Sequence, residues 1–236
     1  MCFKKILFLL LLLLVNIIAV SQIKQKKVAV NSKLAITIFK LSKNYSDGTT
    51  MINALHQIIA LEGANSTYKD TLAITYYKMN NPLSCHLVVK ELLEKKPNNL
   101  VLLELDAMSL QQLNAKKEAI TAFEKLFALS KNKYHGYQLA MLQQSIKRLA
   151  EAMVTINQVT TCEDIKGAEL DFPVDKNNTQ KVSLNAAIMN VKGLIAYELK
   201  DTTLAKKSFE EAIKISPDFV LAKQNAEALE VELTKK

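Results

Sequence analysis

A period of about 34 residues constrains the fold of this chain more than any other feature of its sequence. In every copy an anchor residue is followed by apolar residues four and seven positions later. The anchors of the first four copies are 34, 34 and 33 residues apart, and a fifth copy follows after 53. In chain order the anchors are Met51, Cys85, Ala119, Ala152 and Ala205. Such a period predicts stacked helix pairs, in which small side chains allow close approach and apolar ones fill the seam.

The last copy, "LAKKSFEEAIKISP" (204–217), shows the pattern most completely. Gly193 precedes Ala205 by twelve residues, and Phe209 follows it by four. Ala212 follows by seven and Pro217 by twelve. Since proline cannot continue a helix, Pro217 is expected to end the second helix of its pair. The regular spacing therefore indicates packing, and the adjacent acidic residues of this helix are read as a solvated face.

These residues carry a resemblance to the tetratricopeptide repeat (TPR) family, and specifically to exported bacterial TPR proteins. The residues that carry it are Gly193, Ala205, Phe209, Ala212 and Pro217, with Leu72, Ala73, Tyr76 and Pro97 in the copy around Cys85. The resemblance covers roughly residues 33–235. It implies an all-α solenoid of antiparallel helix pairs, about four and a half in number.

Two segments depart from a plain helical array. "AELDFPVDKNNTQKVSLN" (168–185) alternates apolar and polar residues on either side of an Asp/Asn-rich turn, which predicts a β-hairpin inserted at about 165–185. An irregular loop is the alternative, and Pro173 would restrict its strand to a sheet edge. Segment 33–43 is read as the first helix, although its β-branched residues also allow a strand. Residues 22–32 form a polar, lysine-rich lead-in expected to be flexible, and 218–235 form a last capping helix.

The N-terminal 21 residues are predicted to be a signal peptide. Two lysines precede an apolar run from Ile6 to Val20, and small residues before Gln22 suit a signal peptidase. The run is 15 residues long, shorter than a membrane-spanning helix requires. We therefore expect export to the periplasm or cell envelope of a Gram-negative-like bacterium, with no membrane span after cleavage.

The rest of the sequence contains few patterns typical of a catalytic, metal-binding or nucleic-acid-binding site. The net charge is +8, but Arg148 is the only arginine, a poor composition for reading nucleic acid. No phosphate loop, metal motif or nucleophile motif is present, so we expect no enzyme, no cofactor and no metal site. The three histidines are isolated in sequence and are expected at the surface. Cys85 and Cys162 are expected to be free, structural thiols.

The resemblance also implies where a partner would bind, because the first helices of TPR pairs face a concave groove. Residues on these helices that do not serve the seam are suited to contact a protein or peptide. They are Ile74, Tyr77, Met108, Gln111, Tyr134, Tyr137, Met141, Gln144, Asn190, Leu194 and Tyr197. The predicted function is a non-enzymatic protein-interaction scaffold. Two alternatives stay open: a self-associating structural subunit whose groove holds its own hairpin, and an enzyme with a site between hairpin and groove.

Overall fold

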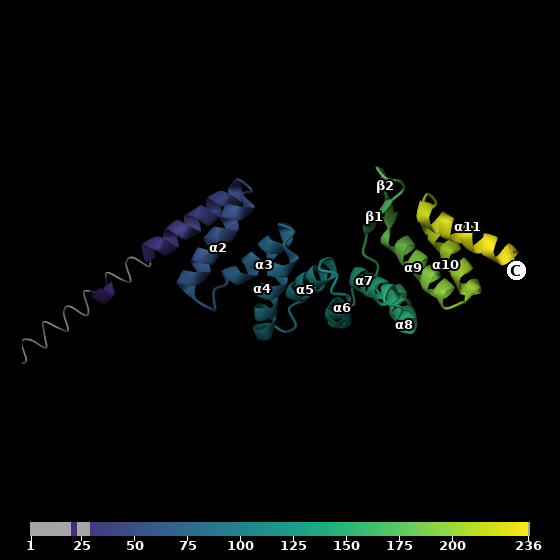
Figure 1. Ribbon diagram of the computed structural model, residues 1–236, viewed down its shortest axis with the longest axis horizontal. Coiled ribbons are helices and arrows are strands. Elements are labelled where there is room, and N and C mark those ends of the chain that lie inside the picture. Colours follow the sequence, from purple (N-terminus) through teal and green to yellow (C-terminus); the bar gives the residue numbers. More distant parts are fainter. Residues whose placement is uncertain (1–19, 23–28, 236) are drawn as a thin grey trace, which may run out of the picture. The chain divides into compact units, whose positions relative to one another are not determined.

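The computed structural model describes residues 20–22 and 29–235, and these residues are mostly helical (Figure 1). They belong to two compact units, of which the first ends at Glu94 and the second begins at Lys95. The predicted signal peptide lies outside the described residues except for positions 20 and 21. Among the described residues, no helix is long and apolar enough to cross a membrane.

The first unit contains two helix pairs. Its helices span 29–44, Gly48–Glu62 (α2), Tyr68–Lys78 (α3) and Pro82–Lys95 (α4). Segment 33–43, for which a strand was the alternative, is helical, and the helix already includes residues 29–32 of the predicted lead-in. Ala35 and Ser42 are buried on one side of it, two helical turns apart. That burial favours the helix over the β-branched preference for a strand.

The second unit contains three helix pairs, a two-stranded sheet and a final single helix. Its elements are Leu100–Gln112 (α5), Lys116–Ser130 (α6), Lys133–Ser145 (α7), Leu149–Thr161 (α8), Glu169–Pro173 (β1), Thr179–Ser183 (β2), Leu184–Glu198 (α9), Thr202–Ile215 (α10) and Val220–Thr234 (α11). Apart from the short helical segment at 20–22, the described residues thus form five pairs and one further helix, where the sequence suggested about four and a half. The all-α solenoid architecture is confirmed within each unit.

The repeat register is confirmed by burial. Cys85, Ala119, Ala152 and Ala205 are completely buried, whereas Met51, the largest anchor, is partly exposed. The residues four and seven positions after every anchor are also buried. The proline stops behave as expected: α10 ends two residues before Pro217, and α4 ends two residues before Pro97.

Gly193 is required for the closest approach in the last pair. A Cβ at this position would enter the ring of Phe209, well inside van der Waals contact. Gly136 plays the same part between α7 and its neighbours, because its Cβ would meet Val159 and Phe127. Both rings are buried, so neither can move aside into solvent.

The turn inside each helix pair repeats with the same period as the anchors. The residue five positions before each anchor adopts a left-handed conformation, with φ between 53° and 68°. These residues are Ser46, Asn80, Asn114, Lys147 and Lys200. In the last pair the amide of Asp201 donates to the carbonyl of Ala196 at 2.9 Å, which closes a Schellman motif. The sequence pattern contained this turn without a glycine to mark it.

Replacing Lys200 with glycine is expected to stabilise the second unit by about 0.5–1 kcal/mol, because only glycine adopts positive φ without a steric penalty. The measurement is chemical denaturation followed by circular dichroism. Lys207→Gly, in the interior of α10, is the control and is expected to destabilise by about 1 kcal/mol. A loss of stability in Lys200→Gly equal to that of the control would contradict the argument.

The predicted hairpin is present, and the irregular loop is excluded. Strands β1 and β2 pair antiparallel, with Leu170 opposite Val182 and Phe172 opposite Gln180. The ring of Phe172 lies 4.8 Å from that of Phe219, centroid to centroid, just before α11. Gln180 donates to the carbonyl of Asp218 and accepts from the first amide of α11. The hairpin therefore fixes the start of α11.

Candidate functional site

The eleven residues predicted to line a groove all lie on the first helices of their pairs, which we call A helices: α3, α5, α7 and α9. In the second unit, side-chain hydrogen bonds link successive A helices. Gln111 of α5 donates to Gln138 of α7 at 3.0 Å, and Gln144 of α7 donates to Glu198 of α9 at 3.0 Å. Polar residues on this side of the unit therefore hold neighbouring A helices in register.

Tyr137 and Asn190 contribute almost no surface. Tyr137 is 3% exposed and Asn190 is 2% exposed. Burial raises the pKa of the Tyr137 hydroxyl, because the phenolate would lose its hydration. Asn190 accepts a hydrogen bond from Asn225 of α11 at 2.8 Å. These two residues serve the packing between helices, so we leave them out of the surface proposed below.

Helix α11 occupies the side of α9 on which the sequence analysis placed three groove residues. Besides Asn190, these are Leu194 and Tyr197, which pack against a buried cluster that includes Leu229 of α11. The Tyr197 hydroxyl donates to Glu232, and this bond raises the pKa of Tyr197. The last A helix is therefore engaged by the chain's own final helix.

Besides Leu194 and Tyr197, five of the predicted residues in the second unit keep partial exposure. They are Met108, Gln111, Tyr134, Met141 and Gln144. Met141 is the most open of them, with 38% of its surface exposed. The two glutamines already donate to neighbouring helices, so Met108, Tyr134 and Met141 are the side chains here that are suited to contact an apolar partner group.

One electrostatic contact on this side was not expected from the sequence. His135 was expected at the surface but is buried, with Nε2 3.6 Å from Oε1 of Glu104 on α5. Its Nδ1 lies 2.9 Å from the Ser130 hydroxyl. The His135 side chain lowers the pKa of Glu104 by hydrogen bonding. Glu104 falls on the same side of α5 as Met108, one helical turn away, and that spacing is the only sequence pattern that could have pointed to it.

The first unit has an open hollow of about 400 Å³ beside Ile74. Apolar atoms come from Phe39 of the first helix, from Met51 of α2, and from Ile74 and Met79 at α3. Lys43 and Lys78 also line it. Ile74 is 38% exposed, and Tyr77, one turn further along α3, is partly exposed. The hollow could accept an apolar side chain and favours a negative charge next to it.

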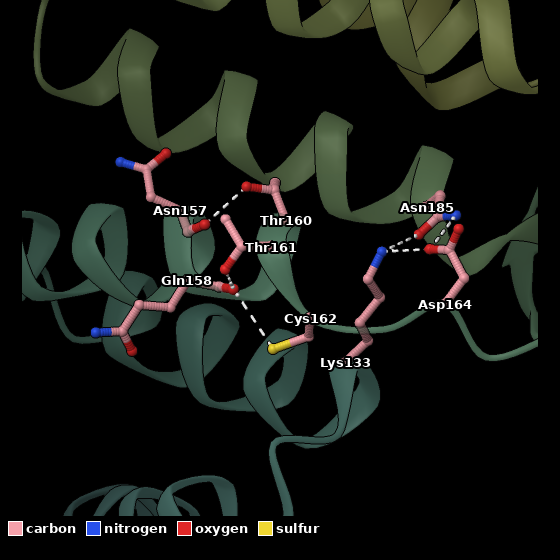
Figure 2. A network of polar contacts seen from close by, with 8 residues as sticks. All are labelled: Lys133, Asn157, Gln158, Thr160, Thr161, Cys162, Asp164 and Asn185. Carbon is pink, nitrogen blue, oxygen red and sulfur yellow. Dashed lines mark hydrogen bonds and ion pairs between the residues drawn. The ribbon is translucent and has the colours of Figure 1, made fainter.

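A buried lysine holds the segment that leads into the hairpin. Lys133, at the start of α7, is 6% exposed. Figure 2 shows its ammonium group between Asp164, which follows α8, and Asn185 of α9. Asn185 also donates to Asp164 at 3.0 Å, and the bond from Lys133 lowers the pKa of Asp164. Lys133 donates to both Asp164 and Asn185, and these two residues are bonded to each other, so we assign the cluster a structural part.

Neither cysteine forms a disulfide, as predicted. Cys85 is buried, and the thiol of Cys162 donates to the Gln158 carbonyl at 3.4 Å (Figure 2). Within residues 20–22 and 29–235, no group of three or more histidine, cysteine or carboxylate side chains could hold a metal ion.

Comparison with known proteins shows which segment of the chain matches a known repeat. Residues 186–219 match the family model described as tetratricopeptide repeat. The chain contains a TPR motif. No curated protein sequence matches it. Among solved structures, MamA is 15% identical with a TM-score of 0.63, over 79% of this chain and 92% of that chain. A MamA fragment from Desulfovibrio magneticus RS-1 is 12% identical with a TM-score of 0.60, over 80% and 97%.

YrrB, described as a TPR protein with an unusual peptide-binding site, is 16% identical with a TM-score of 0.64. It covers 88% of this chain and 97% of its own. Identities this low show the fold and no more. Together with the matched repeat, they show that the chain has the fold of a TPR array.

Proposed function

We propose that this TPR protein is a non-enzymatic scaffold that binds a protein or peptide segment on its A helices, in the periplasm or cell envelope. The hollow beside Ile74 carries the proposal. It combines an apolar floor with two lysines, and it lies on an A helix where the repeat pattern predicted a binding residue. The peptide-binding site named for YrrB supports the same use of the fold.

The partner segment would place an apolar side chain against Phe39, Ile74 and Met79, with an acidic group toward Lys43 and Lys78. In the second unit, Met108, Tyr134 and Met141 would receive apolar groups. Methionine adapts to different shapes, and tyrosine gives a rigid amphipathic surface.

The self-associating alternative has a weaker basis. The hairpin packs against the start of α11 through Phe172 and Gln180, which accounts for its apolar side. We therefore do not propose that the protein's own hairpin covers the surface of α5 and α7. The alternative of an enzyme between hairpin and groove has no cluster of reactive side chains to support it among the described residues.

A photoreactive residue at position 74 or 141 is expected to capture a partner in the native cell. Both side chains are accessible, whereas position 137 is buried. The same residue at Lys207, exposed on the second helix of its pair, is the control. Mass spectrometry would identify the adducts. The captured partner is expected to bind the Ile74→Glu variant about tenfold more weakly or worse, since a charge would face the apolar contact.

Equal adducts at positions 74, 141 and 207 would refute binding on the A helices. Adducts consisting only of this chain would favour the self-associating subunit instead.

A further inference from the structure

The helix at 29–44 has a second apolar side, about 100° around the helix axis from its buried one. Val30, Leu34 and Leu41 lie on it, and Tyr45 follows the helix on the same side. Their exposed fractions are 60%, 59%, 49% and 80%. Spacings of four, seven and four residues align them along one stripe, because 3.6 residues complete a turn. We call these four residues the outer stripe.

The outer stripe lies in the most basic part of the chain. No aspartate or glutamate occurs before Asp47, and residues 22–46 contain six lysines. Three of these, Lys33, Lys40 and Lys43, are on the helix and exposed. The other three precede it in the sequence. A stretch with only positive charge beside an exposed apolar stripe differs from the second unit, where acidic and basic residues alternate.

The lysines are placed along one edge of the stripe. Lys33 precedes Leu34 by one residue, and Lys40 precedes Leu41 by one, so both lie about 100° to the same side. An apolar stripe with lysines along its border is the arrangement of helices that lie in a membrane interface. There the apolar side chains enter the boundary of the acyl chains, and the ammonium groups reach the headgroups.

We propose that the outer stripe docks this protein on an anionic lipid surface, with Lys33 and Lys40 on the headgroup phosphates. A second copy fits less well. Two stripes packed face to face in antiparallel orientation would bring the lysines of both copies to the same edge. Helix α11 is also a poor match for the outer stripe of a second copy. Its exposed apolar residues Val231 and Leu233 lie only near its end, and the carboxylate of Glu230 already pairs with Lys206.

Vesicle co-sedimentation of the full chain, as its cells produce it, tests the proposal. Binding is expected to phosphatidylglycerol-containing vesicles and to be at least about tenfold weaker to pure phosphatidylcholine vesicles. Lys33→Gln/Lys40→Gln is expected to weaken binding to the anionic vesicles by about tenfold or more, since each lysine near such a surface contributes about fivefold. Leu34→Gln/Leu41→Gln is expected to weaken it by about tenfold or more through the lost apolar contact.

The matched control is Leu83→Gln/Leu87→Gln. These leucines lie four residues apart on α4 of the same unit and are each 54% exposed. The residues directly before them are Pro82 and His86 in place of the lysines that border the outer stripe, although Lys90 lies on the same side. Circular dichroism would verify that all variants fold. The control is expected to bind like the parent protein. An equal loss in the control, or equal binding to both lipids by the parent and the lysine variant, would overturn the proposal. The proposal would also be overturned, in favour of a second copy, if the parent protein formed concentration-dependent dimers and did not bind vesicles. In that case the Leu34→Gln/Leu41→Gln variant would be monomeric.

Discussion

Phe209→Ala is expected to lower the free energy of unfolding of the second unit by about 3–5 kcal/mol, the usual cost of deleting a buried phenyl ring. The ring packs with Ala196, Ala205 and Leu229, so its loss would leave a cavity where α9, α10 and α11 meet. Gly193 lies against the ring and has no side chain to fill the space. Chemical denaturation of the parent and the variant would measure the difference.

A double-mutant cycle with Gly193→Ala separates this close approach from general loss of packing. Alone, Gly193→Ala is expected to cost about 1–3 kcal/mol, because its methyl group would enter the Phe209 ring. In the Phe209→Ala background the same methyl group would lie in the cavity. The double variant is therefore expected to be more stable than the sum of the two losses, by about 1 kcal/mol or more.

Gly136→Ala provides the matched control for the cycle. Its methyl group would meet Val159 and Phe127, and it shares no contact with Phe209. Its cost is therefore expected to add to that of Phe209→Ala within about 0.5 kcal/mol. If the Gly193 pair proved equally additive, the regular Gly–Ala–Phe spacing would not report a direct contact.

The seams of the helix pairs could be predicted because they depend on local spacing. The interval from Ala205 to Phe209 and Ala212 places three side chains on one side of a helix, and the same intervals recur at Cys85, Ala119 and Ala152. A helix that repeats such a side must bury it against a similar helix. The hairpin was predictable for a related reason, since Leu170 and Phe172 alternate with polar residues as a half-buried strand requires.

The exposed part of the A helices could not be predicted in the same way. A helical register places Tyr137 and Met141 on one side of α7, yet Tyr137 is buried and Met141 is 38% exposed. Which of them is covered depends on how neighbouring helices pack on α7, and that packing is not encoded in the spacing along α7. Asn190 was misplaced for the same reason, because its cover comes from Asn225 of α11.

Contacts between residues far apart in the sequence were also missed. Lys133 reads as a surface lysine, but Asp164 and Asn185 surround its ammonium group. His135 and Glu104 belong to different repeats and meet only when α5 and α7 stack. A single chain contains no pattern that links such positions. The same limit applies to the outer stripe. From the sequence its apolar residues look like core residues, but in the structure they are exposed.

Phe219→Ala is expected to lower the free energy of unfolding by about 3–5 kcal/mol and to loosen the hairpin and α11 together. Phe219 is fully buried between Val182 of the hairpin and Ala222 of α11, and the Phe172 ring rests on it. Hydrogen exchange is the decisive measurement. The amides of β2 and α11 are expected to lose protection together, while those of α5 and α6 keep theirs.

Gln180→Ala is the matched variant, because it removes only the polar link between the hairpin and α11. It is expected to cost about 0.5–1.5 kcal/mol and to increase exchange mainly in the first turn of α11. If Phe219→Ala released α11 while β2 stayed protected, the hairpin would be held independently of α11. Joint release would mean that the insertion and the final helix form one cooperative unit that covers α9. The hairpin would then keep α11 packed on α9. The exposed A-helix surface of the second unit would therefore consist of α5 and α7, without α9.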